Sequence, residues 1–123
     1  MTPRGATAYR KADLDSAPKH LVLERLFERF GRDVADAKIA IAVTKDIQKK
    51  AAMIDHALRI VIELIAALDH EAAPELCANL ESIYHFVTDR LTEANHTLAT
   101  SPLDEAARLM ADIGAAFREV HAR

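Results

Sequence analysis

The stretch from Lys45 to Asp69 constrains the fold most, because its apolar residues cover more of a helix than a core-facing stripe requires. One stripe repeats with alternating spacings of four and three residues, as in a helix that faces a bundle core: Ile47, Ala51, Ile54, Leu58, Val61, Ile65 and Leu68. A second stripe runs beside it: Met53, Ala57, Ile60, Leu64 and Ala67. At about 100° per residue, the two stripes merge into an apolar arc of more than roughly half the circumference. This helix is therefore either central in the fold or reserves part of its surface for a partner.

Helix-start signals divide the chain into four helical segments. Ser16-Ala17-Pro18 supplies a capping hydroxyl and then a proline, whose missing N–H costs nothing in the first turn. Asp46 is expected to cap the second helix, and Pro74 to be the first residue of the third. Ser101, followed three residues later by Asp104, resembles a capping box for the fourth. We expect the first helix over about 17–43, the second from 46 to near His70, the third from 74 to about 98, and the fourth from 101 to the end of the chain.

Connections of only a few residues force successive helices to run antiparallel. The sequence therefore predicts an all-α fold, an antiparallel up-down-up-down four-helix bundle over 16–123. An N-terminal arm over 1–15, mobile or short-helical, is expected to precede it. The length of 123 residues is typical of one domain, so we expect a single helical-bundle domain over 1–123.

Composition and charge argue against several classes of protein. The net charge of -3, without a basic face, argues against a nucleic-acid partner. Arg59 and Glu63 interrupt the best apolar run, so no membrane span is expected. The first residues lack the apolar core of a secretory signal, and Cys77 is the single cysteine, which favours a reducing compartment. We expect a cytoplasmic protein that resides in the cytosol.

Candidate catalytic and metal-binding residues do not form a recognisable site. Glu93 and His96 have the Glu-x-x-His spacing of di-iron bundles, but such sites need two copies and two further inward Glu residues. Cys77, beside Leu76 and Leu80, is typical of a small buried apolar residue rather than a nucleophile. We therefore expect no enzyme activity, no cofactor and no metal. A helical enzyme subunit that uses a metal through Glu93 and His96 is a third interpretation, which elemental analysis would test.

The remaining signal is apolar surface. Met53, Ile60 and Leu64 are either core residues packed against the first or third helix, or part of a groove for an amphipathic helix or extended apolar segment of another protein. The groove interpretation gives these partner-binding candidates: Met53, Ala57, Ile60 and Leu64 from the second helix, with Tyr84 and Phe86 from the third. Tyr84 and Phe86 lie on opposite flanks, so at most one faces a given groove.

A series of short strings follows the whole chain: Ala8-Tyr9, Ser16-Ala17-Pro18, Leu21-Val22-Leu23, Ala37-Lys38-Ile39-Ala40-Ile41, Lys45-Asp46-Ile47, Lys50, Ile54-Asp55-His56-Ala57, Ile62-Glu63-Leu64, Leu68-Asp69, Pro74-Glu75-Leu76-Cys77-Ala78-Asn79-Leu80, Ile83-Tyr84 and Leu91-Thr92-Glu93-Ala94-Asn95. In this order and spacing the chain, from about Ala8 to Arg118, resembles the flagellar export chaperone (FliS) family. It departs from the family where Arg29 replaces a usual Gly and where Ala72-Ala73 replaces a Gly pair.

The resemblance implies a cytoplasmic flagellar secretion chaperone. Such a chaperone binds the disordered C-terminal segment of flagellin, prevents premature polymerisation in the cytosol and helps deliver flagellin to the type III export apparatus. A component of the flagellar export gate is a further implied partner. The resemblance also implies that the arm, through Tyr9, occupies part of the client path in the empty chaperone. The alternative is a helical-bundle adaptor that binds another flagellar regulator, such as an anti-sigma factor or co-chaperone.

Overall fold

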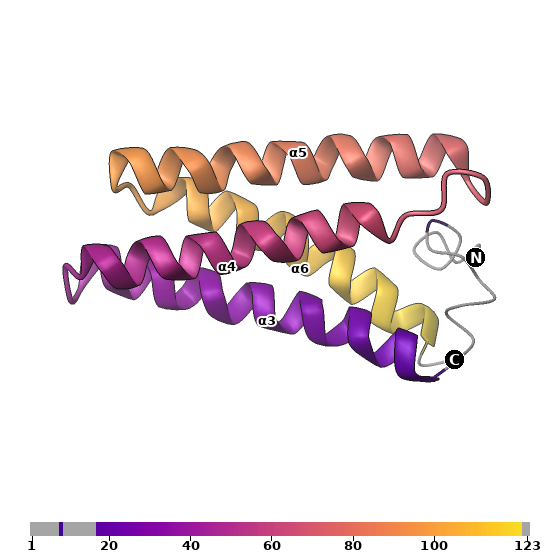
Figure 1. The fold of residues 1–123 in the computed structure, drawn as a ribbon, viewed down its shortest axis with the longest axis horizontal. Helices are drawn as coiled ribbons and strands as arrows, with labels where there is room; N and C mark the ends of the chain where they lie inside the picture. Colours follow the sequence, from indigo (N-terminus) through magenta and orange to yellow (C-terminus); the bar gives the residue numbers. More distant parts are fainter. Residues whose placement is uncertain (1–7, 9–16, 122–123) are drawn as a thin grey trace.

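The computed structural model describes Ala8 and residues 17–121. It contains four long helices, shown in Figure 1: α3 (Ala17–Ala42), α4 (Ile47–Ala66), α5 (Pro74–Thr97) and α6 (Ser101–His121). The described residues contain no strand. The predicted all-α fold and its antiparallel four-helix bundle are confirmed. Apart from Ala8, the expected N-terminal arm lies outside the described residues.

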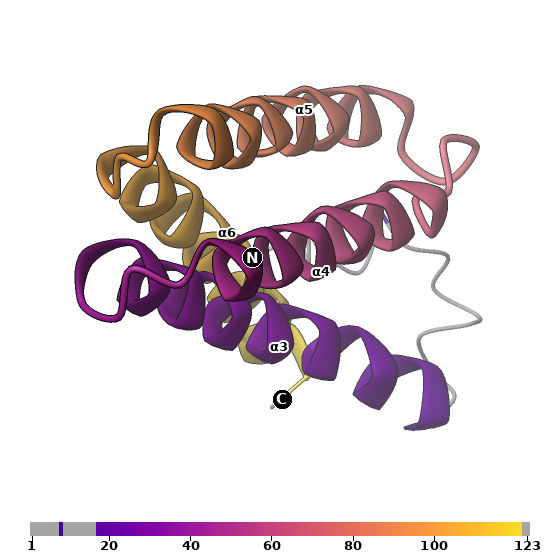
Figure 2. The ribbon, with the colours of Figure 1, turned by 60° about the vertical axis from the view of Figure 1, so that its left-hand side comes forward.

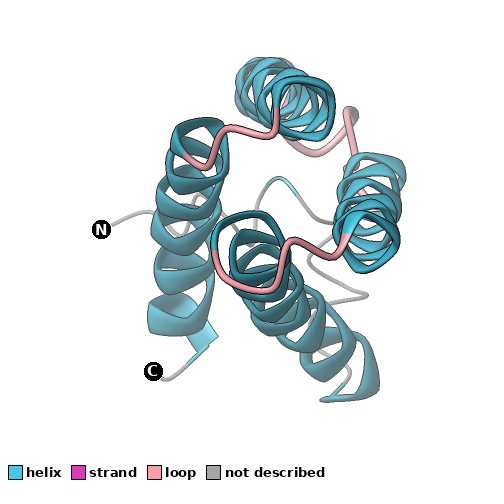
Figure 3. Cartoon of the chain, turned by 90° about the vertical axis from the view of Figure 1, so that its left-hand side faces the viewer, coloured by secondary structure: helices cyan, strands magenta, loops and turns pink. Residues whose placement is uncertain are grey.

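The four helices close into a ring, which the end-on view of Figure 3 shows as four corners of a square. Among the described residues, α3 packs against α4 and α6, and α5 packs against α4 and α6, whereas the diagonal pairs make no such contact. Figure 2 shows that α6 is inclined to the other helices. It approaches α3 closely at Gly114, where an added Cβ would lie 3.1 Å from the Cβ of Phe27. Within the described ranges, no helix has the length and apolar character that crossing a membrane requires.

Two predicted helix starts are confirmed in atomic detail. Asp46 is the N-cap of α4, and its Oδ1 accepts a hydrogen bond of 3.0 Å from the N–H of Lys49. Pro74 occupies the first turn of α5, as its lack of an N–H allows. The predicted cap at Ser101 is wrong by one residue. Ser101 is already helical, and the carbonyl of Thr100 accepts the hydrogen bond from the N–H of Asp104.

Two predicted helix ends extend too far. The second helix ends at Ala66 rather than near His70, because the chain turns through residues 67–73 before α5 begins. The third helix ends at Thr97, and Leu98, expected on its inner stripe, has a left-handed φ of 60° and an exposed side chain. Periodicity continues past both ends, so it cannot locate them.

The buried residues of α4 show which of its sides faces the core. The second stripe, for which the sequence left core and partner groove open, points into the bundle: Ala57, Ile60 and Leu64 are buried together with Ile54 and Val61. Tyr84 on α5 is fully buried as well. In a square bundle each helix contacts two neighbours, so burial extends over an arc wider than one stripe. The burial of Ala57, Leu64 and Tyr84 therefore favours the core alternative for these residues.

Candidate partner-binding surface

A cavity of about 350 Å³ lies between α3 and α4, and we call it the α3–α4 groove. Its lining residues recur at helical spacing on each helix, so one face of each helix forms one wall. The α3 wall consists of Val22, Arg25, Leu26, Arg29 and Asp33, and the α4 wall of His56, Arg59, Ile60 and Glu63. Leu26 and Ile60 give the groove apolar surface, whereas the other members are mostly charged.

Asp33 is the unusual member of the α3–α4 groove, because it is only 5% exposed. Its Oδ1 lies 4.0 Å from Nδ1 of His56, and its buried Oδ2 has no hydrogen-bond partner within the described part of the chain. Burial raises the pKa of the Asp33 carboxyl, while the nearby charges of His56 and Arg29 oppose the rise. A buried acceptor without a partner costs about 1–3 kcal/mol of stability. The fold therefore retains a polar group that does not stabilise it.

Three arginines give the rim of the α3–α4 groove an excess of positive charge. Arg25 and Arg29 come from α3 and are exposed, and Arg59 comes from α4. Arg59 makes an exposed ion pair with Asp55, at 3.1 Å between Nε and Oδ2. Glu63 is the one acid that lines the groove besides Asp33. The rim is therefore suited to donate hydrogen bonds to carbonyl or carboxylate oxygens of a bound segment.

At the end of the bundle where α3 meets α4, a buried lysine joins α4 to α5. Lys50 is 6% exposed, and its Nζ donates to the backbone carbonyl of Asn95 at 3.0 Å and to Asn95 Oδ1 at 2.7 Å. Lys50 also lines a cavity of about 590 Å³ with these residues: Ala40, Ile41, Ala42, Lys45, Ile47, Leu98, Ala99 and Thr100. Since Lys50 has partners within the chain, we assign it a structural role.

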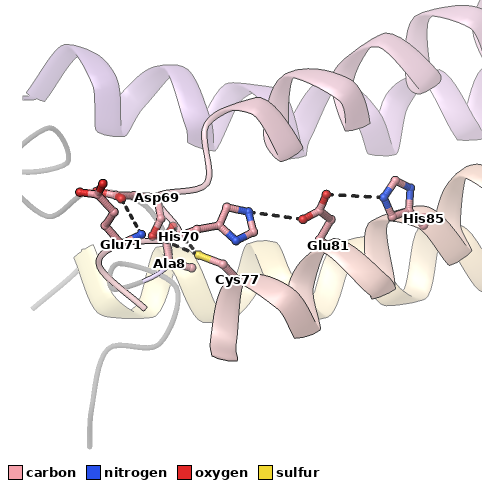
Figure 4. Close-up of polar contacts among 7 residues, drawn as sticks. All are labelled: Ala8, Asp69, His70, Glu71, Cys77, Glu81 and His85. Carbon is pink, nitrogen blue, oxygen red and sulfur yellow. Dashed lines mark hydrogen bonds and ion pairs between the residues drawn. The ribbon is translucent and has the colours of Figure 1, made fainter. Parts of the chain in front are cut away.

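At the opposite end, Ala8 contacts the α4–α5 connection, as Figure 4 shows. The carbonyl of Ala8 accepts hydrogen bonds from the N–H of Asp69, at 2.8 Å, and from the thiol of Cys77, at 3.3 Å. The carbonyl of Asp69 lies at 3.3 Å from the same sulfur. Burial, followed by the charge of Asp69, raises the pKa of the Cys77 thiol. Cys77 is thus a buried hydrogen-bonding residue of the core, in agreement with its predicted role.

Figure 4 also shows the polar contacts that surround this connection. The side chain of Asp69 accepts a hydrogen bond of 3.1 Å from the N–H of Glu71. Glu81 lies between two histidines, with His70 Nε2 at 3.3 Å and His85 Nε2 at 3.7 Å from its carboxylate oxygens. These contacts are at the surface, where ion pairs contribute little to stability. They orient the turn and form no enclosed site.

The structure divides the described partner-binding candidates between the core and the surface. Met53 packs against the buried core cluster, and four others belong to it: Ala57, Ile60, Leu64 and Tyr84. Met53 is half-buried, and Phe86 is 44% exposed, with the guanidinium carbon of Arg90 5.5 Å from its ring centroid. Ile60 is buried and lines the α3–α4 groove. Tyr9 lies outside the described residues. Partner contact at these residues stays a prediction.

Sequence reasoning missed Asp33, although a signal was present. Asp33 follows Phe30 by three residues and precedes Ala37 by four, which places it on the inner face of the first helix. An acid at such a position must find a partner or remain a buried acceptor. The pair once considered for a metal, Glu93 and His96, is exposed, and the described part of the chain has no group of three His, Cys, Asp or Glu residues placed to hold a metal ion.

These features define a four-helix-bundle protein with open cavities and exposed apolar side chains on its surface. The sequence model of the flagellar protein FliS family matches residues 2–123, and the chain belongs to this family. It is 32% identical over 103 residues to flagellar secretion chaperone FliSB of Pseudomonas aeruginosa, covering 84% of this chain and 81% of that protein. It is 26% identical over 117 residues to flagellar secretion chaperone FliS of Vibrio cholerae, covering 92% and 85% of the two chains. Flagellar secretion chaperone FliS of Salmonella typhimurium is 26% identical over 124 residues, which cover 97% of this chain and 91% of that protein.

Proposed function

We propose that this flagellar export chaperone binds the disordered C-terminal segment of flagellin in the cytosol, keeps it from polymerising and delivers it to the type III export apparatus. The observation that carries the proposal is the family match over nearly the whole chain, residues 2–123. The proposed action is binding alone, without a catalytic step. A component of the export gate is the proposed second partner, which receives the loaded chaperone.

The exposed apolar surface supports this proposal. A disordered client that folds on binding must bury apolar side chains to offset the entropy that it loses. The bundle offers exposed or half-buried apolar side chains for this purpose, including Met53 on α4 and Phe86 on α5. We propose these two residues, together with Ile60 in the α3–α4 groove and Tyr9 on the arm, as contacts of the client path.

The first test is a calorimetric titration of the full chain with the C-terminal segment of its organism's flagellin. We expect saturable binding of one client per chaperone and a gain of helicity in the mixture by circular dichroism, because the client folds as it binds. An N-terminal flagellin segment of the same length is the control and should not bind. If the C-terminal segment fails to bind even a chain that lacks residues 1–15, the client is another protein. An anti-sigma factor and a co-chaperone would then be titrated.

The second test concerns the arm. Ala8, the one described residue of the arm, contacts Asp69 and Cys77 at the α4–α5 connection. We propose that the arm, through Tyr9, covers part of the client path in the empty chaperone and that the client displaces it. Removal of residues 1–15 should then raise the rate constant of client association. The expected factor is one divided by the fraction of time for which the path is open in the full chain.

Stopped-flow association of a fluorescent client measures this rate. Tyr9→Ala is the matched variant, because it keeps the backbone carbonyl of Ala8 and should speed association as well. Thermal melting of both variants checks that the bundle stays folded. Equal association rates for the full and shortened chains would contradict the proposal.

A further inference from the structure

The strongest unexplained feature of the molecule is the Asp33 carboxylate. Among the residues that the structure describes, its Oδ2 has no hydrogen-bond partner, and Nδ1 of His56 lies 4.0 Å from its Oδ1. A carboxylate can accept about four hydrogen bonds, and a buried one lowers its energy when donors reach it. Because Asp33 lines the α3–α4 groove, a segment bound there can supply the missing donor.

The charges around Asp33 select the kind of donor. Three arginines line the same groove and one of them, Arg59, is paired with Asp55, so with Glu63 as the other lining acid a cationic client side chain would still meet an excess of like charge at the rim. A neutral donor avoids this repulsion. The side-chain carboxamide of Asn or Gln is the group that fits both kinds of neighbour, because its NH₂ donates to a carboxylate and its oxygen accepts from a guanidinium.

The apolar residues that line the rest of the groove can contact the client residues next to this Asn or Gln. Leu26 and Ile60 provide apolar surface beside Asp33, and Val22 is exposed at the Arg25 end of the groove. A client segment with an apolar side chain next to an Asn or Gln can therefore bury the apolar side chain in the groove, while the Asn or Gln forms a hydrogen bond with Asp33. His56 is half-exposed and its Nδ1 lies 4.0 Å from Oδ1 of Asp33, so a rotation of the His56 side chain can make room for a donor beside the carboxylate.

We propose that the α3–α4 groove binds one Asn or Gln side chain of the client's C-terminal segment, with Asp33 as the acceptor for its NH₂ and a rim arginine as the donor to its oxygen. This inference rests on the proposed function and adds to it a polar contact that selects the client. It also explains why the fold retains a buried acceptor that weakens the free chaperone.

The test compares client affinity between the wild type and Asp33→Leu by calorimetry at neutral pH. Leu has a similar shape and removes the acceptor, so we expect binding weaker by about tenfold or more, the effect of losing a hydrogen bond to a charged group. Asp36→Leu is the matched control, since Asp36 lies on the same helix, is exposed and does not line the groove. It should bind the client as the wild type does.

A double-mutant cycle identifies the client residue. Each Asn and Gln of the client segment is replaced by Ala, and one of these variants should lose affinity with the wild type but lose little more with Asp33→Leu. Equal client affinities for the wild type and Asp33→Leu would overturn the inference and leave the proposed function intact. Coupling of Asp33 to a client lysine or arginine would also overturn it. If the wild type binds no client at all, both proposals fail.

Melting of the free proteins gives a second readout. Burial raises the pKa of Asp33 against the opposing charges of His56 on α4 and of Arg29 and Arg32 on α3, with Asp36 adding to the rise. The folded state therefore favours the protonated carboxyl, and it loses this stabilisation as the pH rises through the folded-state pKa. Asp33→Leu should melt higher than the wild type at neutral pH, and the difference should shrink toward acidic pH. A lower melting temperature for Asp33→Leu at neutral pH would show that Asp33 has a structural partner and would overturn the inference.

Discussion

Replacing Leu64 by Asp is expected to unfold the bundle. Leu64 is fully buried in α4, and it lies in the core with Val61 and Tyr84. An aspartate at this position would place an unpaired charge among apolar side chains, at a cost of more than about 4 kcal/mol. Small domains have only about 5–15 kcal/mol of stability, so most of it would be lost. Circular dichroism should show a large loss of helicity or a melting temperature far below that of the wild type.

Ile62→Asp is the matched control for this prediction. Ile62 lies two residues away on the same helix but is 64% exposed, so an aspartate there remains in water. We expect its melting temperature to stay close to that of the wild type. The result that would contradict our placement of Leu64 is a Leu64→Asp variant that melts like the wild type and has lost only client binding. Leu64 would then be a surface residue of the client path.

Replacing Asn95 by Ala is expected to have the next largest effect. The change removes the shorter of the two hydrogen bonds made by the buried ammonium of Lys50 and leaves only the backbone carbonyl as an acceptor. Losing a hydrogen bond to a charged group should lower the free energy of unfolding by about 2 kcal/mol. Urea unfolding measures this as a lower midpoint with an unchanged slope.

The double variant Lys50→Met with Asn95→Ala separates this cause from a general effect at position 95. Replacing both partners by apolar groups can be nearly neutral, so the double variant should recover most of the lost stability. Asn79→Ala, at an exposed position on the same helix, should change little. Equal stabilities of Asn95→Ala and the wild type would show that the Lys50 contact contributes nothing to the fold.

Local signals in the sequence predicted much of the fold. Asp46 and Pro74 act within one turn of their own helix, so their roles could be assigned without knowing the rest of the structure. The order of four helices and their short connections then left one simple topology. The end of the second helix was predicted poorly, because the turn after Ala66 involves the backbone of Ala8 and the side chain of Asp69. The first of these contacts spans distant parts of the chain.

The candidate site was predicted less well, for a related reason. Periodicity shows which residues of α4 are apolar, but it does not show where the two neighbouring helices lie. The sequence therefore left Leu64 open between the core and a groove, whereas in the structure Leu64 is buried and Ile47 and Ile62 are the large exposed apolar residues of α4. The Lys50–Asn95 contact joins residues 45 positions apart, and no local pattern connects them. Asp33 could have been found from its position between Phe30 and Ala37.

The position of Cys77 has a practical consequence for labelling experiments. It is the single cysteine of the chain, and its thiol is buried and hydrogen-bonded, with a pKa that burial raises, so we expect its reaction with maleimide or iodoacetamide to be slow in the folded protein. A cysteine introduced at an exposed position such as Ile62 or Val43 can therefore carry a fluorophore or spin label against a low background. The native thiol need not be removed first, and its contact with Ala8 is preserved while the client path is mapped by distance.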